Sequence, residues 1–161
     1  MKYSFLFFCF LFSISTVNSQ RTIEKTLEKF NKKSVPYISV EELQTKKNTT
    51  ILDSREIEEF TISHLKNAIW VGYKDFDITT LNIKDKNTPI VVYCSIGVRS
   101  ENIGEKLVAN GFTNVKNLYG GIFKWVEKDF PIVDSEGNNT KKVHAFSKHW
   151  GKLLTKGEKI Y

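Results

Sequence analysis

Residues 89–111, PIVVYCSIGVRSENIGEKLVANG, contain the features that decide the fold. An apolar, β-branched run ends at Cys94, a short loop with Gly97 follows, and a helical pattern then continues from about Arg99 to Gly111. Apolar runs without alternation are typical of a strand buried on both faces of a parallel sheet. We therefore expect Cys94 at the carboxyl end of a central strand, on the edge of the sheet where α/β folds bind ligands.

The loop after Cys94 has the features of an anion-binding cradle. The predicted helix points its N-terminus at the loop, so the N–H groups of residues 95–99 and the helix dipole create a positive potential there. The same field lowers the pKa of a thiol and favours the nucleophilic thiolate. The alternative is a small buried side chain, the usual role of a cysteine at a strand end. Gly97 and Arg99 in the loop favour the reactive thiol.

The composition indicates one compact domain with a mildly basic surface. The chain has 161 residues, of which 40% are hydrophobic and 26% are charged, enough for one core and a charged surface. Lys and Arg number 24 against 18 Asp and Glu, and the lysines are scattered among acidic residues. This pattern is typical of a solvated surface, and it gives no footprint of a nucleic-acid partner.

The chain begins with the pattern of a secretory signal peptide. Residues 1–19 have Lys2 ahead of an apolar core, and small residues precede Gln20. The apolar run is shorter than the ~20 residues that a spanning helix needs, so a membrane anchor is the less favoured alternative. We expect an exported protein, periplasmic or secreted, with no stable membrane span after cleavage. Cleavage leaves Cys94 as the only cysteine, which has no partner for a disulfide within the chain.

The rest of the chain alternates between strand and helix patterns. Strands are expected at residues 35–40, 50–52, 68–71, 90–93 and 115–118, and helices at 21–33, 56–60 and 122–128 besides a brief one near residue 41 and the one after the loop. The alternation predicts an α/β domain with a mainly parallel central sheet of four or five strands flanked by helices. We divide the chain into a signal peptide (1–19), an N-terminal helical extension (20–34), the domain (35–133) and a C-terminal helical extension (134–161).

Two carboxylates and an arginine, Asp53, Arg55 and Glu56, follow the second predicted strand and lie on the same edge of the sheet as Cys94. The simpler interpretation is a helix cap by Asp53 or Ser54, with Glu56 in the first turn. The alternative is a functional role beside the thiol.

A lone histidine follows in the segment HLKNA. His64 is expected to be a hydrogen-bonded structural side chain, and the alternative is a proton carrier. Asn67 is expected in a left-handed turn conformation.

Apolar side chains in the C-terminal extension recur at helical spacing and predict an amphipathic helix over residues 144–154. They are Val143, Phe146, Trp150, Leu153 and Leu154. We expect this helix to pack on the domain, and the alternative is a helix that binds a protein partner. His144 and His149 do not share a helical face, so they predict no metal site, and the sequence predicts no organic cofactor.

Several segments together resemble the rhodanese family of sulfurtransferases. They are LDSREIEEF, HLKNA, VVYCSIGVRS, NLYGGIFKW and FPIV, in order and with natural spacing between Ile38 and Val133. In that family, the cysteine that matches Cys94 accepts a sulfane sulfur as a persulfide from a donor such as thiosulfate. It then passes the sulfur to a thiophilic acceptor. The resemblance implies a single-domain sulfurtransferase with an anionic donor and cyanide or a thiol as acceptor, and the signal-peptide pattern adds that it is exported.

The resemblance also implies roles for single residues. It identifies an active loop that follows the nucleophile and holds the anionic donor, with residues Cys94, Ser95, Ile96, Gly97, Val98 and Arg99. Asp53, Arg55 and Glu56 match a segment that braces this loop. Ser95 stands where many members carry arginine, which implies weaker binding of a dianion, and Asn67 stands where many have glycine.

Three other classes of protein share some of these features. A phosphatase of the related fold requires five residues between cysteine and arginine, whereas four separate Cys94 from Arg99. Noncatalytic rhodanese-like binding modules commonly lack the cysteine. A persulfide or redox sensor would use the same thiol, and the sequence does not separate it from a transferase.

Overall fold

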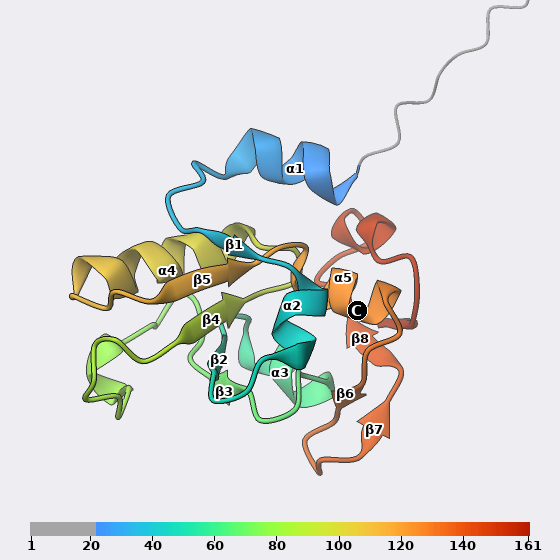
Figure 1. The fold of residues 1–161 in the computed structure, drawn as a ribbon. Helices are drawn as coiled ribbons and strands as arrows, with labels where there is room; N and C mark the ends of the chain where they lie inside the picture. Colours follow the sequence, from blue (N-terminus) through green and yellow to red (C-terminus); the bar gives the residue numbers. More distant parts are fainter. Residues whose placement is uncertain (1–21) are drawn as a thin grey trace, which may run out of the picture.

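The computed structural model describes residues 22–161, shown in Figure 1. The predicted signal peptide lies outside the described residues. Between residues 22 and 161, no helix has both the length and the apolar character needed to cross a bilayer.

A parallel sheet of five strands forms the centre of the domain (Figure 1). Its strands, in spatial order, are β1 (Tyr37–Ile38), β5 (Val115–Leu118), β4 (Ile90–Tyr93), β2 (Thr50–Asp53) and β3 (Ile69–Trp70). All neighbouring pairs are parallel. All four residues of β4 are buried, as the unalternating apolar run predicts for a central strand.

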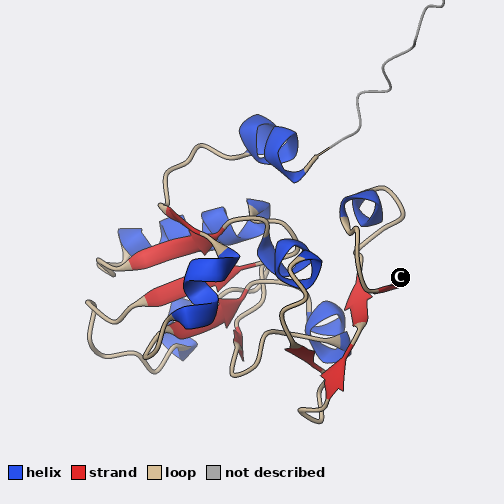
Figure 2. Cartoon of the chain, turned by 45° about the vertical axis from the view of Figure 1, so that its right-hand side comes forward, coloured by secondary structure: helices blue, strands red, loops and turns tan. Residues whose placement is uncertain are grey.

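Helices lie on both sides of this sheet (Figure 2). They are α1 (Ile23–Phe30), α2 (Val40–Thr45), α3 (Ile57–Ile62), α4 (Val98–Ala109) and α5 (Gly121–Glu127). A 3-10 turn, η1 (Ile78–Thr80), interrupts the polar connection before β4. The prediction of an α/β fold with a parallel central sheet and an additional N-terminal helix is confirmed.

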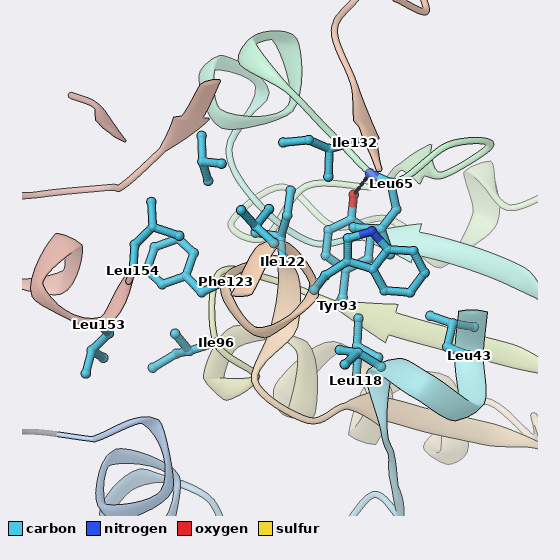
Figure 3. Close-up of a cluster of buried hydrophobic side chains, with 14 of the residues drawn as sticks. Leu43, Leu65, Tyr93, Ile96, Leu118, Ile122, Phe123, Ile132, Leu153 and Leu154 are labelled. Carbon is cyan, nitrogen blue, oxygen red and sulfur yellow. Dashed lines mark hydrogen bonds between the residues drawn. The ribbon is translucent and has the colours of Figure 1, made fainter. Parts of the chain in front are cut away.

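Side chains from the two faces of β4 belong to two separate hydrophobic clusters. Val91 and Tyr93 point into the larger cluster, whose side chains come from α2, α5 and the C-terminal extension (Figure 3). Ile90 and Val92 point into the smaller cluster, which packs against α4. Successive side chains of a strand point to opposite faces, so burial on both sides fixes the strand in the middle of the sheet.

The prediction of a C-terminal helix is wrong. Residues 144–154 contain the 3-10 helix η2 (Trp150–Leu153) and no α-helix. The strands β8 (Lys142–His144) and β9 (Glu158–Ile160), which come before and after η2, pair in parallel. Earlier in the chain, β6 (Ile132–Val133) pairs antiparallel with β7 (Asn139–Thr140).

Strand pairing explains why no helix forms in this segment. The Ala145 N–H donates to the Ile160 carbonyl at 2.8 Å and continues the β8–β9 ladder, so the backbone is already paired. Phe146 then has φ +63°, which no right-handed helix accepts. The expectation that the segment packs on the domain is confirmed, because Val143, Leu153 and Leu154 are buried in the larger cluster.

Candidate active site

Cys94 directly follows β4 and lies at the carboxyl edge of the sheet, as predicted. Its side chain is 1% exposed. It forms part of a cavity of about 210 Å³ lined by Cys94, Ser95, Ile96, Val98, Arg99, Phe146 and Trp150. The structure therefore brings the residues of the predicted loop together around one cavity, except Gly97, which is not among the lining residues.

Gly97 fixes the geometry of the loop. Its φ is +112°, a conformation that favours glycine, and a Cβ there would lie 3.3 Å from the Leu118 carbonyl oxygen. In this conformation the Gly97 N–H donates a hydrogen bond to the Cys94 sulfur at 3.1 Å. Gly97 is also the N-cap of α4 and has no side chain to bond the first amides of that helix. Those amides and the helix dipole create a positive potential at the loop.

The start of α5 supports the loop from behind. The N–H groups of Ile122 and Phe123 donate to the carbonyls of Cys94 and Ser95 at 3.0 and 3.1 Å. The close approach depends on Gly121, which has φ +53° and where a Cβ would overlap the Cys94 carbonyl oxygen. The glycine pair after β5 therefore lets α5 hold the backbone of the nucleophile in place.

The N-terminal extension contacts the same loop. Asn31, which follows α1, donates from its side-chain amide to the Gly97 carbonyl at 2.9 Å. Asn117 of β5 donates to that carbonyl at 2.8 Å. The side chain of Leu27 in α1 also lies close, since a Cβ added to Gly97 would be 3.4 Å from it. Two elements distant in the sequence thus fix one peptide group beside the thiol.

The pKa of the Cys94 thiol lies below its ordinary value. Burial raises this pKa, but the positive charge of Arg99 and hydrogen bonds from Ser100 and the Gly97 amide lower it by more. Ser100 has one hydroxyl proton, and the side-chain oxygen Oδ1 of Asn117 accepts it at 2.7 Å, whereas the Cys94 sulfur lies at 3.6 Å. The charge of Arg99 and the backbone amides of Ser100 and Gly97 are therefore the thiolate stabilisers that do not depend on the Ser100 hydroxyl proton.

Arg99 is part of a buried polar network that involves Glu59 of α3. Its guanidinium donates to both carboxylate oxygens of Glu59, at 2.6 and 2.8 Å, and to the Ser95 hydroxyl oxygen at 3.0 Å. The Ser95 hydroxyl in turn donates to Glu59 at 3.0 Å. Burial raises the pKa of Glu59, but the hydrogen bonds and charge of Arg99 outweigh burial and lower it, so the pair is ionised.

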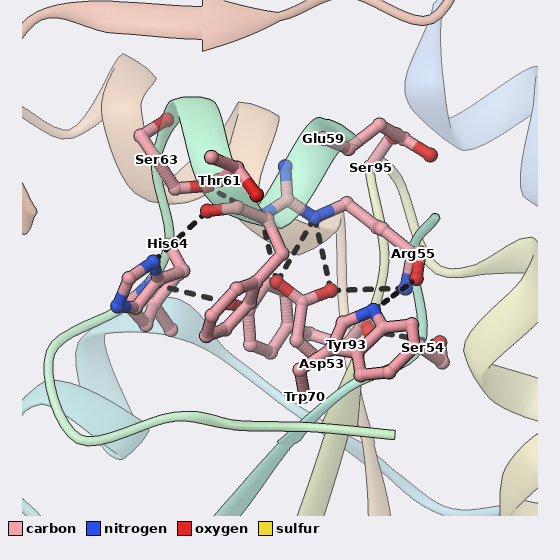
Figure 4. Close-up of polar contacts among 12 residues, drawn as sticks. Asp53, Ser54, Arg55, Glu59, Thr61, Ser63, His64, Trp70, Tyr93 and Ser95 are labelled. Carbon is pink, nitrogen blue, oxygen red and sulfur yellow. Dashed lines mark hydrogen bonds and ion pairs between the residues drawn. The ribbon is translucent and has the colours of Figure 1, made fainter. Parts of the chain in front are cut away.

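The segment Asp53–Glu56 does not line the cavity. Figure 4 shows the polar contacts of Asp53, Ser54 and Arg55. The guanidinium of Arg55 donates to Asp53 at 2.6 Å and to the Ser63 carbonyl at 2.6 Å, and both charged side chains are fully buried. Ser54 donates from its N–H and its hydroxyl to the Tyr93 carbonyl, both at 2.9 Å. The two Ser54 bonds attach the segment to Tyr93, the last residue of β4.

The helix-cap interpretation of Asp53 and Ser54 is wrong. Glu56 is the N-cap of α3, and its N–H donates to Glu59 at 3.1 Å. Asp53 instead accepts hydrogen bonds from Arg55, because a fully buried arginine needs a carboxylate to offset its desolvation.

His64 has structural contacts, as expected. Its Nδ1 lies 3.0 Å from the Phe60 carbonyl, and its ring stacks on the Phe60 ring with centroids 3.9 Å apart. Its backbone forms an antiparallel bridge with Val133. Asn67 has φ +65°, which confirms the predicted left-handed turn. Over residues 22–161, no group of three or more His, Cys, Asp or Glu side chains is placed to hold a metal ion.

Sequence reasoning missed five side chains at or beside the cavity. They are Glu59, Ser100, Asn117, Phe146 and Trp150. Ser100 carried a signal, since it is one turn into the helix that follows the loop. Phe146 and Trp150 were assigned to a helix face, so their place at the cavity had no signal in the sequence.

Comparisons with known proteins give one consistent result. The family described as Rhodanese-like domain matches residues 38–128. Thiosulfate sulfurtransferase GlpE of Coxiella burnetii is 28% identical over 106 residues, which are 66% of this chain and 97% of that protein. The adenylyltransferase and sulfurtransferase UBA4 of Candida albicans is 32% identical over 68% of this chain and 26% of that protein.

Solved structures show the same similarity. The crystal structure of a rhodanese-related protein from Thermoplasma volcanium matches with a TM-score of 0.55 and 28% identity. The match covers 61% of this chain and 97% of that one. Phe146 and Trp150 lie beyond the residues that the family matches.

Proposed function

Because this chain belongs to the Rhodanese-like domain family, we propose that it is a sulfurtransferase whose Cys94 carries a sulfane sulfur as a persulfide. Its similarity to proteins named as sulfurtransferases supports this activity class. The observation that carries the proposal is the hydrogen bond from the Gly97 amide to the Cys94 sulfur at 3.1 Å, in a cavity that Arg99 also lines. A buried structural cysteine needs neither contact.

In the first half-reaction, the Cys94 thiolate attacks the outer sulfur of an anionic donor such as thiosulfate. A sulfur–sulfur bond forms at Cys94 as the donor's own sulfur–sulfur bond breaks, and sulfite leaves with the electron pair. The balance is Cys–S⁻ + S–SO₃²⁻ → Cys–S–S⁻ + SO₃²⁻. Thiolates attack sulfur of this kind directly, so the step requires no general base. The lowered pKa of Cys94 supplies the thiolate.

In the second half-reaction, an acceptor such as cyanide or a thiolate attacks the outer sulfur of the persulfide. With cyanide the balance is Cys–S–S⁻ + CN⁻ → Cys–S⁻ + SCN⁻. The leaving group is the Cys94 thiolate, which the Gly97 amide and the charge of Arg99 stabilise. The same contacts therefore serve both half-reactions.

The loop and the segment Asp53–Glu56 would have different tasks. The N–H groups of residues 95–99 and the N-terminus of α4 would hold the donor's anionic group. Asp53, Arg55 and Glu56 would position the loop from behind, since none of the three lines the cavity. We extend the proposal to an exported protein, which rests on the signal-peptide pattern of residues 1–19.

The test is thiocyanate formation from a sulfane-sulfur donor and cyanide, with thiosulfate and with inorganic polysulfide as donors. We expect turnover by the wild type and none above background by Cys94→Ser. Turnover retained in Cys94→Ser would assign the chemistry elsewhere. A wild type that takes up sulfur once but does not release it to cyanide or a thiol would be a persulfide sensor, and one that takes up none would be a binding module.

A further inference from the structure

The cavity over Cys94 has an aromatic wall that the family match does not include. Phe146 and Trp150 come from the C-terminal extension, whereas the other lining residues come from the loop and the start of α4. Two lining aromatic rings, with Ile96 and Val98, make the wall mainly apolar. A site for an inorganic anion alone has no need of such a wall.

The Phe146 ring is held at the cavity against the preference of its backbone. Phe146 has φ +63°, and a bulky side chain in the left-handed region costs free energy. The side chain nevertheless remains 49% exposed, so burial in the core does not explain its position. Its ring instead covers Arg99, whose guanidinium carbon lies 5.1 Å from the ring centroid. Strain at an exposed residue that faces a cavity points to a function.

Trp150 contacts the N-terminal extension. Its ring lies with its centroid 6.2 Å from that of Phe30, at the end of α1. The N-terminal extension, which also binds the Gly97 carbonyl through Asn31, therefore contacts the C-terminal extension beside the cavity. The C-terminal extension therefore supplies the wall, and the N-terminal extension supports it through the contact of Phe30 with Trp150.

The charge around the thiolate disfavours a dianion. Among the described residues that line the cavity, Arg99 is the only cation, and Glu59 accepts hydrogen bonds from both of its terminal nitrogens. The thiolate, Arg99 and Glu59 together carry a formal charge of −1. Adding thiosulfate would bring two more negative charges into a partly desolvated site, whereas a monoanion would bring one.

The size of the cavity matches a small organic group. Its volume is about 210 Å³, and an apolar cavity of roughly 150 Å³ is enough to bind benzene in another protein. We propose that Phe146 and Trp150 determine specificity by binding the apolar organic group of a monoanionic sulfane-sulfur donor, such as an organic thiosulfonate. This inference rests on the proposed function, because it requires sulfur transfer to Cys94.

The transfer step balances in the same way as for thiosulfate. The Cys94 thiolate attacks the outer sulfur of R–SO₂–S⁻, the donor's sulfur–sulfur bond breaks, and a sulfinate leaves with the electron pair. The balance is Cys–S⁻ + R–SO₂–S⁻ → Cys–S–S⁻ + R–SO₂⁻. The group R would lie against Phe146 and Trp150, and the sulfonyl oxygens would face the loop amides.

The test compares benzenethiosulfonate with methanethiosulfonate, which have the same charge and reacting group. The kcat/KM ratio of the two donors is divided by their rate ratio with free N-acetylcysteine, which removes the difference in intrinsic reactivity. We expect a corrected preference of about tenfold or more for the aryl donor in the wild type. Phe146→Asn should lower the preference at least threefold, and Phe146→Asn combined with Trp150→Ala should bring it close to one.

Asparagine is the chosen replacement because it accepts the left-handed conformation of residue 146 and removes the ring. Val108→Asn is the matched control, because Val108 is also 49% exposed but lies near the far end of α4. It should keep the wild-type preference. A competition measurement needs no variant: benzenesulfinate should inhibit the wild type at a concentration at least about tenfold lower than methanesulfinate does.

Two results would overturn the inference. One is a corrected preference below about twofold in the wild type, and the other is a preference unchanged in a folded Phe146→Asn protein. In both cases, sulfur loading of Cys94 by methanethiosulfonate or thiosulfate would leave the proposed function intact. If no donor loads sulfur on Cys94, the proposed function itself fails.

Discussion

Two arginine–carboxylate pairs lie beside the end of β4, and they differ in what they face. Asp53 and Arg55 are both fully buried, and Arg55 also contacts the Ser63 carbonyl and the Tyr93 ring. Glu59 is buried, but its partner Arg99 is 17% exposed and lines the cavity with Cys94. The first pair is closed off from solvent, whereas the second is open to a ligand on one side.

The difference in exposure separates a structural role from a functional one. A fully buried pair is costly to break, because either partner alone would be an uncompensated charge in the core. At the cavity, water or an anion can replace part of what Glu59 provides to Arg99. The chemistry of the two pairs is the same, so the matched change from carboxylate to amide tests the comparison directly.

The largest effect is expected from Asp53→Asn, which leaves the buried charge of Arg55 without a carboxylate. The free energy of unfolding should fall by about 3–5 kcal/mol. Urea denaturation measures it, and Asp53→Asn combined with Arg55→Met should recover part of the loss. A loss below about 1 kcal/mol would show that the pair is not a major support of the fold.

Glu59→Gln makes the same chemical change at the open pair and should cost less, about 1–2 kcal/mol. It should also remove the negative charge beside Arg99, lower the pKa of Cys94 further and raise kcat/KM for thiosulfate several-fold. Steady-state kinetics and urea denaturation measure the two effects. Equal stability losses in Glu59→Gln and Asp53→Asn would remove the distinction between the pairs.

Acid should weaken the wild type through Glu59. The pKa of Glu59 is lowered in the folded protein, so its contribution is present above the unfolded carboxyl value, about 4.3, and is lost as pH falls through the lower folded value. The free energy of unfolding of Glu59→Gln should therefore fall less steeply below about pH 4 than that of the wild type. Parallel curves for the two proteins would contradict this account.

Arg99→Met should raise the pKa of Cys94, because it removes the charge that opposes burial. The rate of sulfur loading at neutral pH should fall by roughly an order of magnitude. The thiolate absorbance of the wild type minus that of Cys94→Ser, followed against pH, reports the pKa. Arg99→Lys keeps the charge and should shift it less.

The smallest effect on the Cys94 pKa is expected from Ser100→Ala. The Ser100 hydroxyl donates to the side-chain oxygen of Asn117, and the Cys94 sulfur is its more distant neighbour. The same titration should show a rise in the Cys94 pKa that is smaller than in Arg99→Met. A larger rise would mean that Ser100 turns its proton to the thiolate.

The sequence predicted those parts of the molecule whose signals are local. The apolar run before Cys94 and the loop glycine predicted a central strand, a turn and a helix N-terminus, and all are present. Asn67 was expected in a left-handed turn for the same reason, since its residue type favours that conformation.

The parts that were missed depend on contacts between residues distant in the sequence. Glu59 meets Ser95 and Arg99 across 36 and 40 residues, and its own surroundings in the sequence indicate only the start of a helix. The C-terminal segment failed as a helix because Lys142 pairs with Glu158, a partner that helical spacing does not reveal. Phe146 has a positive φ that its residue type does not indicate.

The central claim is that Cys94 holds a transferable sulfur, and intact mass measures this most directly. After incubation with a sulfane-sulfur donor, the wild type should gain the mass of one sulfur atom, located by peptide mapping to the segment that contains Cys94. Cyanide should then remove it, and Cys94→Ser should gain nothing. No mass gain with thiosulfate, polysulfide or an organic thiosulfonate, or an equal gain in Cys94→Ser, would contradict the account.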